Sequence, residues 1–279
     1  MSYQEITYQE GRVARIILNR PGYLNAQSWL LREELDDAFN KAVANKDTGS
    51  IVLSGAGGNF SAGHDISTSE DRAYRKAHGH DGEDPKSIYD NLKEINLSNT
   101  MRWRNLTKPT IAMVEGYCIF GGWMIASSMD IVFAHEDALF LPGQTQYFSV
   151  PWDIGPRKAK EILFEHRYMS ARECLTLGFV NRVFRSEDLE RETLAYAGRV
   201  ADNYLNSPLA VETTKRSINH MSDTMGFSAE MDAAFENFAV MVGLRPAKSA
   251  PPSKGGFSRS QIARDNFEAS NPWINVLGP

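Results

Sequence analysis

The sequence predicts an α/β protein, because β-type runs alternate with helical stretches along much of the chain. Three short apolar runs have strand character: Ile51–Leu53, Thr110–Val114 and Asp130–Ala134. Stretches with apolar residues at helical spacing separate them, and such alternation indicates parallel strands joined by helical crossovers. No short sequence unit recurs at a fixed period, so a simple repeat array is not predicted.

The first fifty residues predict strands, a turn and a helix. A short β-type run over residues 13–18 is interrupted by Arg20-Pro21-Gly22. Apolar residues then recur at helical spacing from Trp29 to Val43. They are Leu31, Leu35, Ala38, Phe39 and Ala42.

Further helices are predicted over residues 86–106, from Gly121-Gly122 through Ala126, and over most of the chain after about residue 190. Two polar segments lack this spacing. Residues 67–88 are predicted to form a mobile surface loop. Ala247–Ser260 is rich in Pro, Ser, Gly and Lys, which predicts a linker or an arm that orders against a partner.

Composition is that of an ordinary soluble globular protein, with 42% hydrophobic and 23% charged residues among 279. A formal net charge of −5 argues against a general nucleic-acid binder. No apolar stretch approaches the roughly 20 residues that span a bilayer, so no membrane partner is predicted. Cys118 and Cys174 form neither a disulfide framework nor a metal-ligand spacing. We therefore expect a cytoplasmic protein without a metal site.

Two glycine-bearing turns follow predicted strands. One is Phe60-Ser61-Ala62-Gly63-His64-Asp65-Ile66, and the other is Gly116-Tyr117-Cys118-Ile119-Phe120-Gly121-Gly122-Trp123. Glycine lets a ligand approach the main chain, and a strand-to-helix turn directs unpaired N–H groups outward. Two such donors on one oxygen would stabilise charge developing on a carbonyl. Neither turn has the pattern of a phosphate loop, and either one alone is equally consistent with a structural role.

Several blocks of sequence resemble, in order, the crotonase or enoyl-CoA hydratase/isomerase superfamily. They are Asn19-Arg20-Pro21 with Asn25-Ala26, Phe60 to Ile66, Val114 to Asp130, Phe140 with Ser149-Val150-Pro151, Ser170 to Cys174 with Gly178 to Asn181, and Pro208-Leu209-Ala210 leading to Lys215. The resemblance implies a crotonase-like spiral of ββα units over residues 1–200. It also implies a helical trimerisation region with a C-terminal arm over residues 201–279, in a homotrimer or a hexamer of two trimers.

The same resemblance implies an acyl-CoA substrate, with coenzyme A present only as part of that substrate and no separate cofactor. The oxyanion donors would be the main-chain N–H groups of His64 and Gly121. The extended CoA site would include five residues near these turns: Tyr23, Leu24, Ala62, Asp65 and Ile66.

Two positions depart from the family pattern. Where the hydratases carry two glutamates that handle a water molecule, this chain has Met124 and Gln144. A thioether carries no proton at neutral pH, and an amide is a poor base. General acid–base catalysis contributes roughly 10²–10⁴-fold, so little hydratase activity is expected unless another residue substitutes.

Asp153 is the predicted substitute. It lies in Val150-Pro151-Trp152-Asp153-Ile154-Gly155, and other members of the superfamily place a catalytic aspartate on this loop. In cyclic β-diketone hydrolases that aspartate orients a histidine, whose position Gln144 takes here. Burial beside Trp152 would raise the pKa of Asp153 toward neutrality. The alternative is a helix N-cap or a surface aspartate.

The other titratable residues have simpler interpretations. The His64 ring is expected to line the pocket mouth, and Asp65 is expected to be a turn and cap residue. His78 and His80 lack a third ligand for a metal and are expected in a solvated loop. Tyr147 either supplies a hydroxyl to the pocket or packs in the core.

Three functions fit these residues. The first is an acyl-CoA lyase or isomerase of the hydratase family that uses Asp153 in place of the glutamates. The second is a hydrolase that cleaves a C–C bond in a cyclic 1,3-diketone or a ring-derived CoA ester. The third is a non-catalytic acyl-CoA binder. The resemblance favours the first, and the residues at 124 and 144 keep the other two open.

Overall fold

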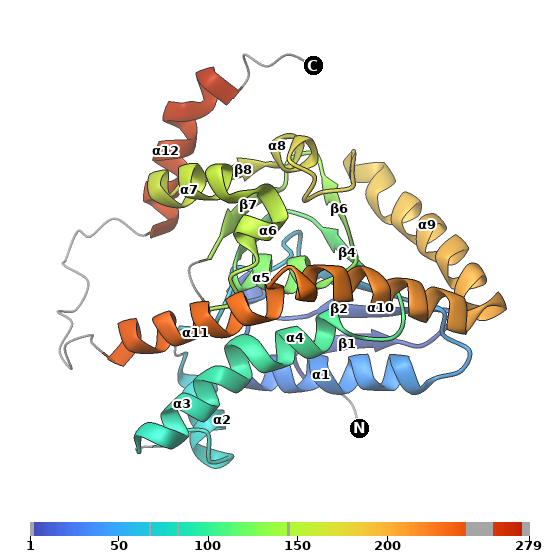
Figure 1. Cartoon of the computed structure of the whole chain (residues 1–279), viewed down its shortest axis with the longest axis horizontal. Coiled ribbons are helices and arrows are strands. Elements are labelled where there is room, and N and C mark those ends of the chain that lie inside the picture. The colour runs from blue at the N-terminus through green and yellow to red at the C-terminus, as the bar shows by residue number, and fades with distance from the viewer. Residues whose placement is uncertain (1–2, 67, 83, 144–145, 244–258, 275–279) are drawn as a thin grey trace.

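Two sheets form the centre of the protein (Figure 1). The computed structural model describes residues 3–66, 68–82, 84–143, 146–243 and 259–274. The larger sheet has the strand order β1-β2-β3-β4-β6-β9, and the smaller has the order β5-β7-β8. The larger sheet consists of β1 (Ile6–Gln9), β2 (Val13–Leu18), β3 (Ser50–Gly55), β4 (Thr110–Val114), β6 (Ile131–His135) and β9 (Arg182–Phe184). The smaller consists of β5 (Tyr117–Phe120), β7 (Leu139–Pro142) and β8 (Met169–Ser170).

The strand pairing follows the predicted spiral. In the larger sheet β2, β3, β4, β6 and β9 pair in parallel, and β1 pairs with β2 antiparallel. After β4 and again after β6, the next strand along the chain belongs to the smaller sheet, where β5 and β7 also pair in parallel. Each of these turns of the chain therefore contributes one strand to each sheet. The predicted α/β class is confirmed.

Helices cover both faces of the larger sheet. Ile51 and Leu53 of β3 pack in one cluster with residues of α1, while Val52 packs in another with Leu189 and Ala197 of α9. Successive side chains of a strand point to opposite faces, so these clusters lie on opposite sides of the sheet. The helices before α9 are α1 (Trp29–Ala44), α2 (Ser69–Ala77), α3 (Pro85–Lys93), the π-helical η2 (Glu94–Ser98), α4 (Asn99–Arg104), α5 (Gly121–Ser128), α6 (Val150–Ile154), α7 (Pro156–Glu165) and α8 (Ala171–Thr176), with a 3₁₀ turn η1 (Pro21–Tyr23). The predicted helices over 29–43, 86–106 and 121–126 are confirmed.

The prediction of a surface loop over residues 67–88 is wrong, because helices occupy most of its described residues. The α2 helix begins after Thr68, whose side chain accepts a hydrogen bond from the Asp71 N–H. The α3 helix begins after Asp84, whose side chain accepts from the N–H groups of Lys86 and Ser87. Polar residues here cap helices and cover their solvent-facing sides, so polar composition did not indicate a loop.

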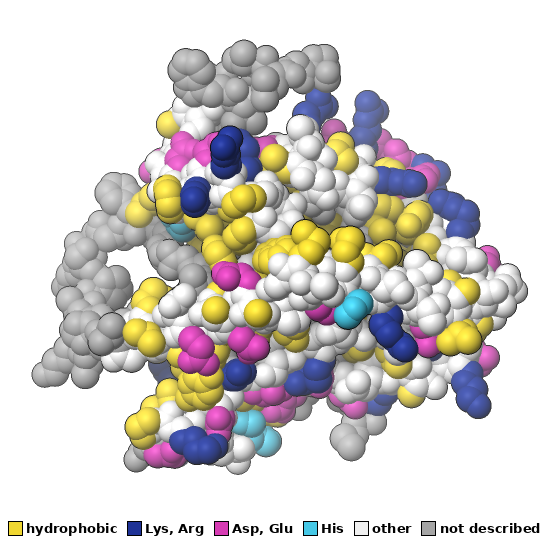
Figure 2. Space-filling model, viewed as in Figure 1, with side chains coloured by type: hydrophobic (Ala, Val, Ile, Leu, Met, Phe, Trp, Pro, Cys, Tyr) yellow, Lys and Arg dark blue, Asp and Glu magenta, His cyan; other side chains and the backbone are white. Residues whose placement is uncertain are grey.

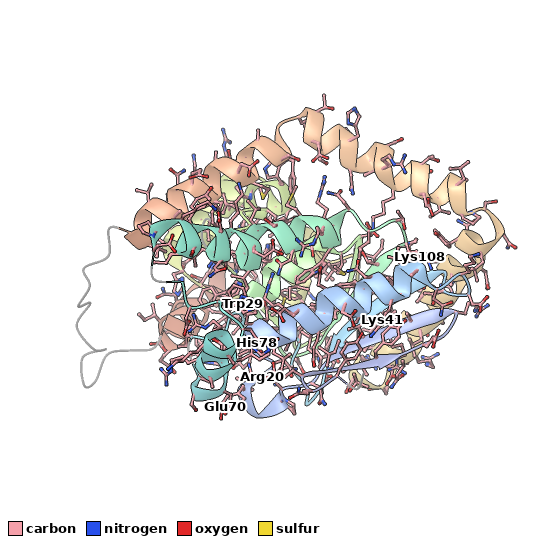
Figure 3. The ribbon with its side chains drawn as sticks, turned by 90° about the horizontal axis from the view of Figure 1, so that it is seen from below. Arg20, Trp29, Lys41, Glu70, His78 and Lys108 are labelled. Carbon is pink, nitrogen blue, oxygen red and sulfur yellow. The ribbon has the colours of Figure 1, made fainter. Side chains whose placement is uncertain are left out.

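Asp71 of α2 binds the first residue of α1. Figure 3 shows this region, with Trp29 and His78 labelled. The buried Asp71 carboxylate accepts a hydrogen bond from the Trp29 N–H at 2.8 Å and pairs with Arg75 at 3.0 Å. Asp71→Ala is expected to lower the free energy of unfolding by about 2–3 kcal/mol, because it leaves a buried donor unpaired. Urea denaturation measures this, with exposed Glu70→Ala as the control. Equal stability of the two variants would contradict it.

The last described part of the chain is helical, as predicted. It comprises α9 (Ser186–Asn206), α10 (Pro208–Thr224), α11 (Phe227–Gly243) and α12 (Arg259–Ile274). The predicted division at residue 200 lies inside α9. Ala263 of α12 packs in a small cluster with Leu141 and Tyr168, so this helix returns to the smaller sheet. Residues 247–258 of the predicted arm lie outside the described residues.

Apolar side chains are exposed along α10 and α11. Figure 2 shows hydrophobic side chains along the face that these helices cross. More than half of the surface of each of the following is exposed: Leu209, Ile218, Met221, Met225 and Val240. Among the described residues, no helix combines the length and the hydrophobicity that a membrane span requires.

Candidate active site

The first glycine-bearing turn is held between Gln27 and β5 of the smaller sheet by two isolated parallel β-bridges. On one side, the Ser61 N–H donates to the Tyr117 carbonyl of β5 at 2.8 Å. On the other side, the Gln27 N–H donates to the Gly63 carbonyl at 2.8 Å, and the Gln27 carbonyl accepts from the Asp65 N–H at 2.9 Å. This segment is therefore held between Gln27 and β5, and β5 leads directly into the second turn.

The main chains of the two turns are in contact at Gly63 and Gly121. A Cβ atom added to Gly63 would lie 3.1 Å from the Gly121 nitrogen and 2.8 Å from the Ile119 carbonyl oxygen. Gly63 also has a φ of +93°, so both its conformation and its surroundings require glycine. A Cβ added to Gly121 would lie 2.8 Å from Nδ1 of His64. The two turns are thus adjacent in space.

Phe120 has a strained backbone immediately before Gly121, with φ 49° and ψ −106°. Such strain costs on the order of 1–3 kcal/mol and is concentrated at functional sites. Because Gly121 is the first residue of α5, its N–H has no acceptor within the helix. Within the described part of the chain, neither the Gly121 N–H nor the His64 N–H has a hydrogen-bond acceptor. Two unpaired main-chain donors therefore lie in adjacent turns.

The His64 ring lies against Gly121. Its Nε2 atom is shielded from solvent and has no hydrogen-bond partner among the described residues. Burial, with a smaller effect from the charge of Arg32, lowers the pKa of His64 to about 3. The ring is therefore neutral at pH 7 and a weak base.

Asp153 connects α5 to α6. Its Oδ2 atom accepts hydrogen bonds from Trp123 Nε1 at 3.0 Å, Ser127 Oγ at 2.9 Å and Ser149 Oγ at 2.7 Å, while Oδ1 accepts from Ser127 Oγ at 3.1 Å. Burial raises the pKa of Asp153 to about 6, although these hydrogen bonds act in the opposite direction. Asp153 lies within α6, whose N-cap is Ser149, so it is not a helix N-cap, and the residue is half-buried.

The desolvation predicted for Asp153 is present, but the tryptophan that bonds its carboxylate is Trp123. Trp152 is 36% exposed and packs against Phe227, whereas the indole of Trp123 donates to the Asp153 carboxylate. On a helix, adjacent side chains point in different directions, so a neighbour in sequence need not cover the carboxyl group.

An apolar wall follows the second turn. It is formed by Met124 and Tyr147 with residues of η2 and α11: Leu97, Phe227, Met231, Phe235 and Phe238. A Cβ added to Gly143 would lie 3.2 Å from Cε of Met124 and 3.4 Å from Cα of Phe120, so this wall reaches the strained turn. Tyr147 packs in this wall, which agrees with the core-packing interpretation. Its hydroxyl has no hydrogen-bond partner among the described residues. Gln144 lies outside the described residues.

The residues predicted to contact CoA lie close to the first turn. The Ala62 N–H donates to the Leu24 carbonyl at 2.9 Å, which joins the two predicted segments. Tyr23, Leu24 and Ile66 are 46%, 43% and 95% exposed, which is high for side chains of this type. These three residues therefore offer an exposed apolar surface beside Ala62.

Asp65 and the two loop histidines have structural partners. The Asp65 carboxylate pairs with buried Arg20 at 3.0 Å and accepts a hydrogen bond from the Thr68 N–H at 2.8 Å. This supports the turn-and-cap interpretation for its side chain. His78 and His80 each stack on a neighbouring aromatic ring. Within the described ranges, no group of three or more His, Cys, Asp and Glu side chains could hold a metal ion.

Sequence reasoning missed two buried polar residues behind the turns, Gln27 and Arg32, which are 1% and 2% exposed. Arg32 follows Leu31 and precedes Leu35 by three positions, so it lies within the apolar stripe of α1. A charged residue inside such a stripe was the available signal.

Comparison with known proteins identifies the family. The family model for enoyl-CoA hydratase/isomerase matches residues 8–242. The chain belongs to this family. Its membership confirms the predicted place in the crotonase superfamily and the prediction of an acyl-CoA-processing enzyme of the hydratase/isomerase type.

Relatives of known structure and name agree with this family. EchA13 of Mycobacterium tuberculosis, provisionally named an enoyl-CoA hydratase, is 36% identical over 82% of this chain and 77% of its own. The structure of a probable enoyl-CoA hydratase from Mycobacterium thermoresistibile is 37% identical, covers 85% of this chain and 99% of that one, and has a TM-score of 0.75. An enoyl-CoA hydratase/isomerase structure from Xanthobacter autotrophicus Py2 is 28% identical, covers 99% of both chains and has a TM-score of 0.74. The crotonase fold predicted for this chain is therefore confirmed.

Proposed function

We propose that this enzyme forms the enolate of an acyl-CoA thioester and holds its oxygen between the N–H groups of His64 and Gly121. The observation that carries the proposal is the contact between the two turns at Gly63 and Gly121. Each turn has one main-chain N–H, that of His64 or Gly121, without an acceptor among the described residues. As the Cα proton leaves, negative charge develops on the thioester oxygen, and fixed donors stabilise it. The loss of one such donor typically costs on the order of 2.7–4 kcal/mol.

Asp153 is the proposed acceptor of the Cα proton. With a pKa of about 6 it is mostly ionised at pH 7 and remains a useful base. Among the described residues, its Oδ1 accepts a hydrogen bond only from Ser127, so this oxygen can still accept a proton. His64, with its pKa of about 3, is the weaker base and acts through its main chain. Gln144 remains a predicted site residue.

The CoA moiety is proposed to contact Tyr23, Leu24, Ala62, Asp65 and Ile66. Support comes from the exposed apolar side chains at 23, 24 and 66, which a bound nucleotide or pantetheine arm would cover. The Asp65 side chain is engaged by Arg20 and its N–H by Gln27, so its contribution would come from its main-chain carbonyl.

A homotrimer or a hexamer of two trimers is proposed as the working assembly. The exposed apolar side chains of α10 and α11 support an interface there, because such patches commonly mark contacts between proteins. The cytoplasmic location predicted from composition stays a prediction.

Cleavage of a C–C bond in a cyclic β-diketone or a ring-derived CoA ester is the second candidate. Met124 of the apolar wall stands where the hydratases carry a glutamate, so the usual two-carboxylate hydration lacks one of its groups. Asp153 would then be the group that activates the water consumed when the C–C bond is cleaved. The same pair of donors would then hold the enolate that leaves when the C–C bond breaks.

An assay with crotonyl-CoA tests the proposal, combined with calorimetric titration of CoA and crotonyl-CoA. If the wild type turns over crotonyl-CoA and Asp153→Asn does not, the lyase or isomerase is supported. Binding without turnover would favour the hydrolase or the non-catalytic binder, and a cyclic β-diketone substrate would then separate these two. Absence of acyl-CoA binding would overturn the proposal.

A further inference from the structure

Arg32 is a buried cation held by neutral groups. It is 2% exposed, and its guanidinium donates to Gln27 Oε1 at 2.5 Å, Asn99 Oδ1 at 2.6 Å and Thr100 Oγ1 at 3.0 Å. The guanidinium carbon also lies 4.8 Å from the centre of the Trp103 ring. None of these partners carries a negative charge.

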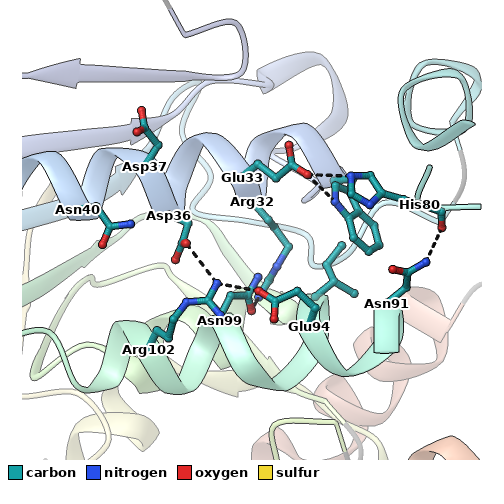
Figure 4. Close-up of a pocket in the computed structure, with 12 residues that line it drawn as sticks. Arg32, Glu33, Asp36, Asp37, Asn40, His80, Asn91, Glu94, Asn99 and Arg102 are labelled. Atoms are coloured by element: carbon teal, nitrogen blue, oxygen red, sulfur yellow. Dashed lines mark hydrogen bonds and ion pairs between the residues drawn. The ribbon is translucent and has the colours of Figure 1, made fainter. Parts of the chain in front are cut away.

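The acidic residues whose charges act on Arg32, Asp36 and Glu94, are paired with a different arginine. Arg32 lines a polar pocket of about 350 Å³. In this pocket Asp36 and Glu94 accept hydrogen bonds from Arg102 at 3.1 and 2.7 Å (Figure 4). Across the described residues, Arg32 itself forms no ion pair, and its Nε atom has no hydrogen-bond partner. An unpaired buried charge costs several kcal/mol, so its retention points to a use.

Burial lowers the pKa of Arg32 to about 9, so the side chain stays charged at neutral pH. The π-helical η2 precedes two of its acceptors, Asn99 and Thr100, and the Asn99 N–H still bonds back to the Glu94 carbonyl. Such a π-turn alters the register of the helix and is frequent at functional sites. It allows two consecutive residues to reach the same guanidinium.

Gln27 connects this charge to the two turns. Its Oε1 atom, which accepts from Arg32, lies 3.0 Å from the Cβ position of Gly121. Its Nε2 donates to Ser61 Oγ at 3.0 Å, and that oxygen accepts from the Gly63 N–H at 3.1 Å. One amide group therefore separates the guanidinium from the turns. The charge of Arg32 also acts on the pKa of His64, which indicates that its field reaches the site.

We propose that Arg32, acting through Gln27, is the positioning residue that supplies a permanent positive potential behind the His64 and Gly121 donors and so favours the enolate. This inference rests on the proposed function. Arg32 does not touch the substrate; it fixes Gln27, and its charge attracts the electron density that moves onto the thioester oxygen. A potential of this kind needs no reorganisation when the enolate forms.

Acetoacetyl-CoA provides the test, because its enolate absorbs in the near ultraviolet where the keto form does not. A pH titration of the bound ligand gives the apparent pKa of its enolisation. Gln27→Glu keeps the size of the side chain and its bond to Arg32, but it removes the Nε2 donor to Ser61 Oγ and neutralises the charge; Arg32→Met removes the charge and leaves that donor in place. It is expected to raise that apparent pKa by about 1–2 units, a roughly 10- to 100-fold smaller enolate fraction. Arg32→Met is expected to act in the same direction.

Arg12→Met is the matched control, since it removes one positive charge from an exposed pair with Asp202. It should leave the apparent pKa of the bound ligand unchanged. If Gln27→Glu also leaves it unchanged while the wild type promotes enolisation, the role of Arg32 is overturned, even where Arg32→Met fails to fold. If the wild type itself does not lower the apparent pKa below that of free acetoacetyl-CoA, the proposed function fails instead.

Discussion

Gly121→Ala is expected to reduce enolate stabilisation by about 100- to 1,000-fold. The added Cβ would lie 2.8 Å from His64 Nδ1 and 3.0 Å from Gln27 Oε1, so the neighbouring groups must move. Gln27 cannot move freely because Arg32 and Ser61 hold its amide. The added Cβ therefore displaces the two turns and separates the His64 and Gly121 donors, although residue 121 keeps its own N–H. The enolate absorbance of bound acetoacetyl-CoA measures the loss.

Gly243→Ala is the control for this variant, because an added Cβ at that glycine meets nothing within 4 Å. Overpacking at residue 121 should lower the free energy of unfolding by about 1–3 kcal/mol, which leaves the protein folded. A folded Gly121→Ala protein with wild-type enolate absorbance would exclude residue 121 from the oxyanion site.

Asp153→Asn is expected to lower the rate of Cα proton removal by roughly 10²–10⁴-fold, since an amide cannot accept the proton. For the wild type, the rate should fall on the acid side with a midpoint near the Asp153 pKa of about 6. The measurement is exchange of the Cα hydrogens of bound acyl-CoA with deuterated solvent as a function of pH. Asp137→Asn, which changes a carboxylate with 88% side-chain exposure, is the control. An unchanged acid limb in Asp153→Asn would contradict the assignment.

Asp153→Asn should also change how stability depends on pH. In the wild type, ionisation of Asp153 increases the rate of proton removal but lowers the stability of the folded protein. The folded-state pKa of Asp153 is raised, so the folded protein binds the proton more tightly than the unfolded chain. Wild-type stability therefore declines as pH rises from about 4 to about 6, by about 3 kcal/mol for this group. Asp153→Asn should lack that decline. Urea denaturation at several pH values would show this, and a retained decline would place its origin elsewhere.

Much of the fold could be predicted from local patterns. The α1 helix follows from its apolar spacing, and β3 and β4 follow from short apolar runs between turn residues. The segment from 67 to 88 was misjudged because its caps, such as Thr68, consist of the same polar residues that loops favour. Which of these roles a polar residue takes depends on partners distant in sequence, as Asp71 shows by binding Trp29.

The sequence alone determined the α/β class, the family and the two turns, because glycine requirements and apolar periodicity are local properties of the chain. It could not determine what surrounds each side chain. Burial raises the pKa of Asp153, and the hydrogen bonds from Ser149, Ser127 and Trp123 oppose that rise. The role proposed for Arg32 depends on Gln27 and Asn99. Burial and charge act through space, and only the folded chain brings these groups together. If the N–H groups at 64 and 121 served two different oxygens, the proposed chemistry would fail.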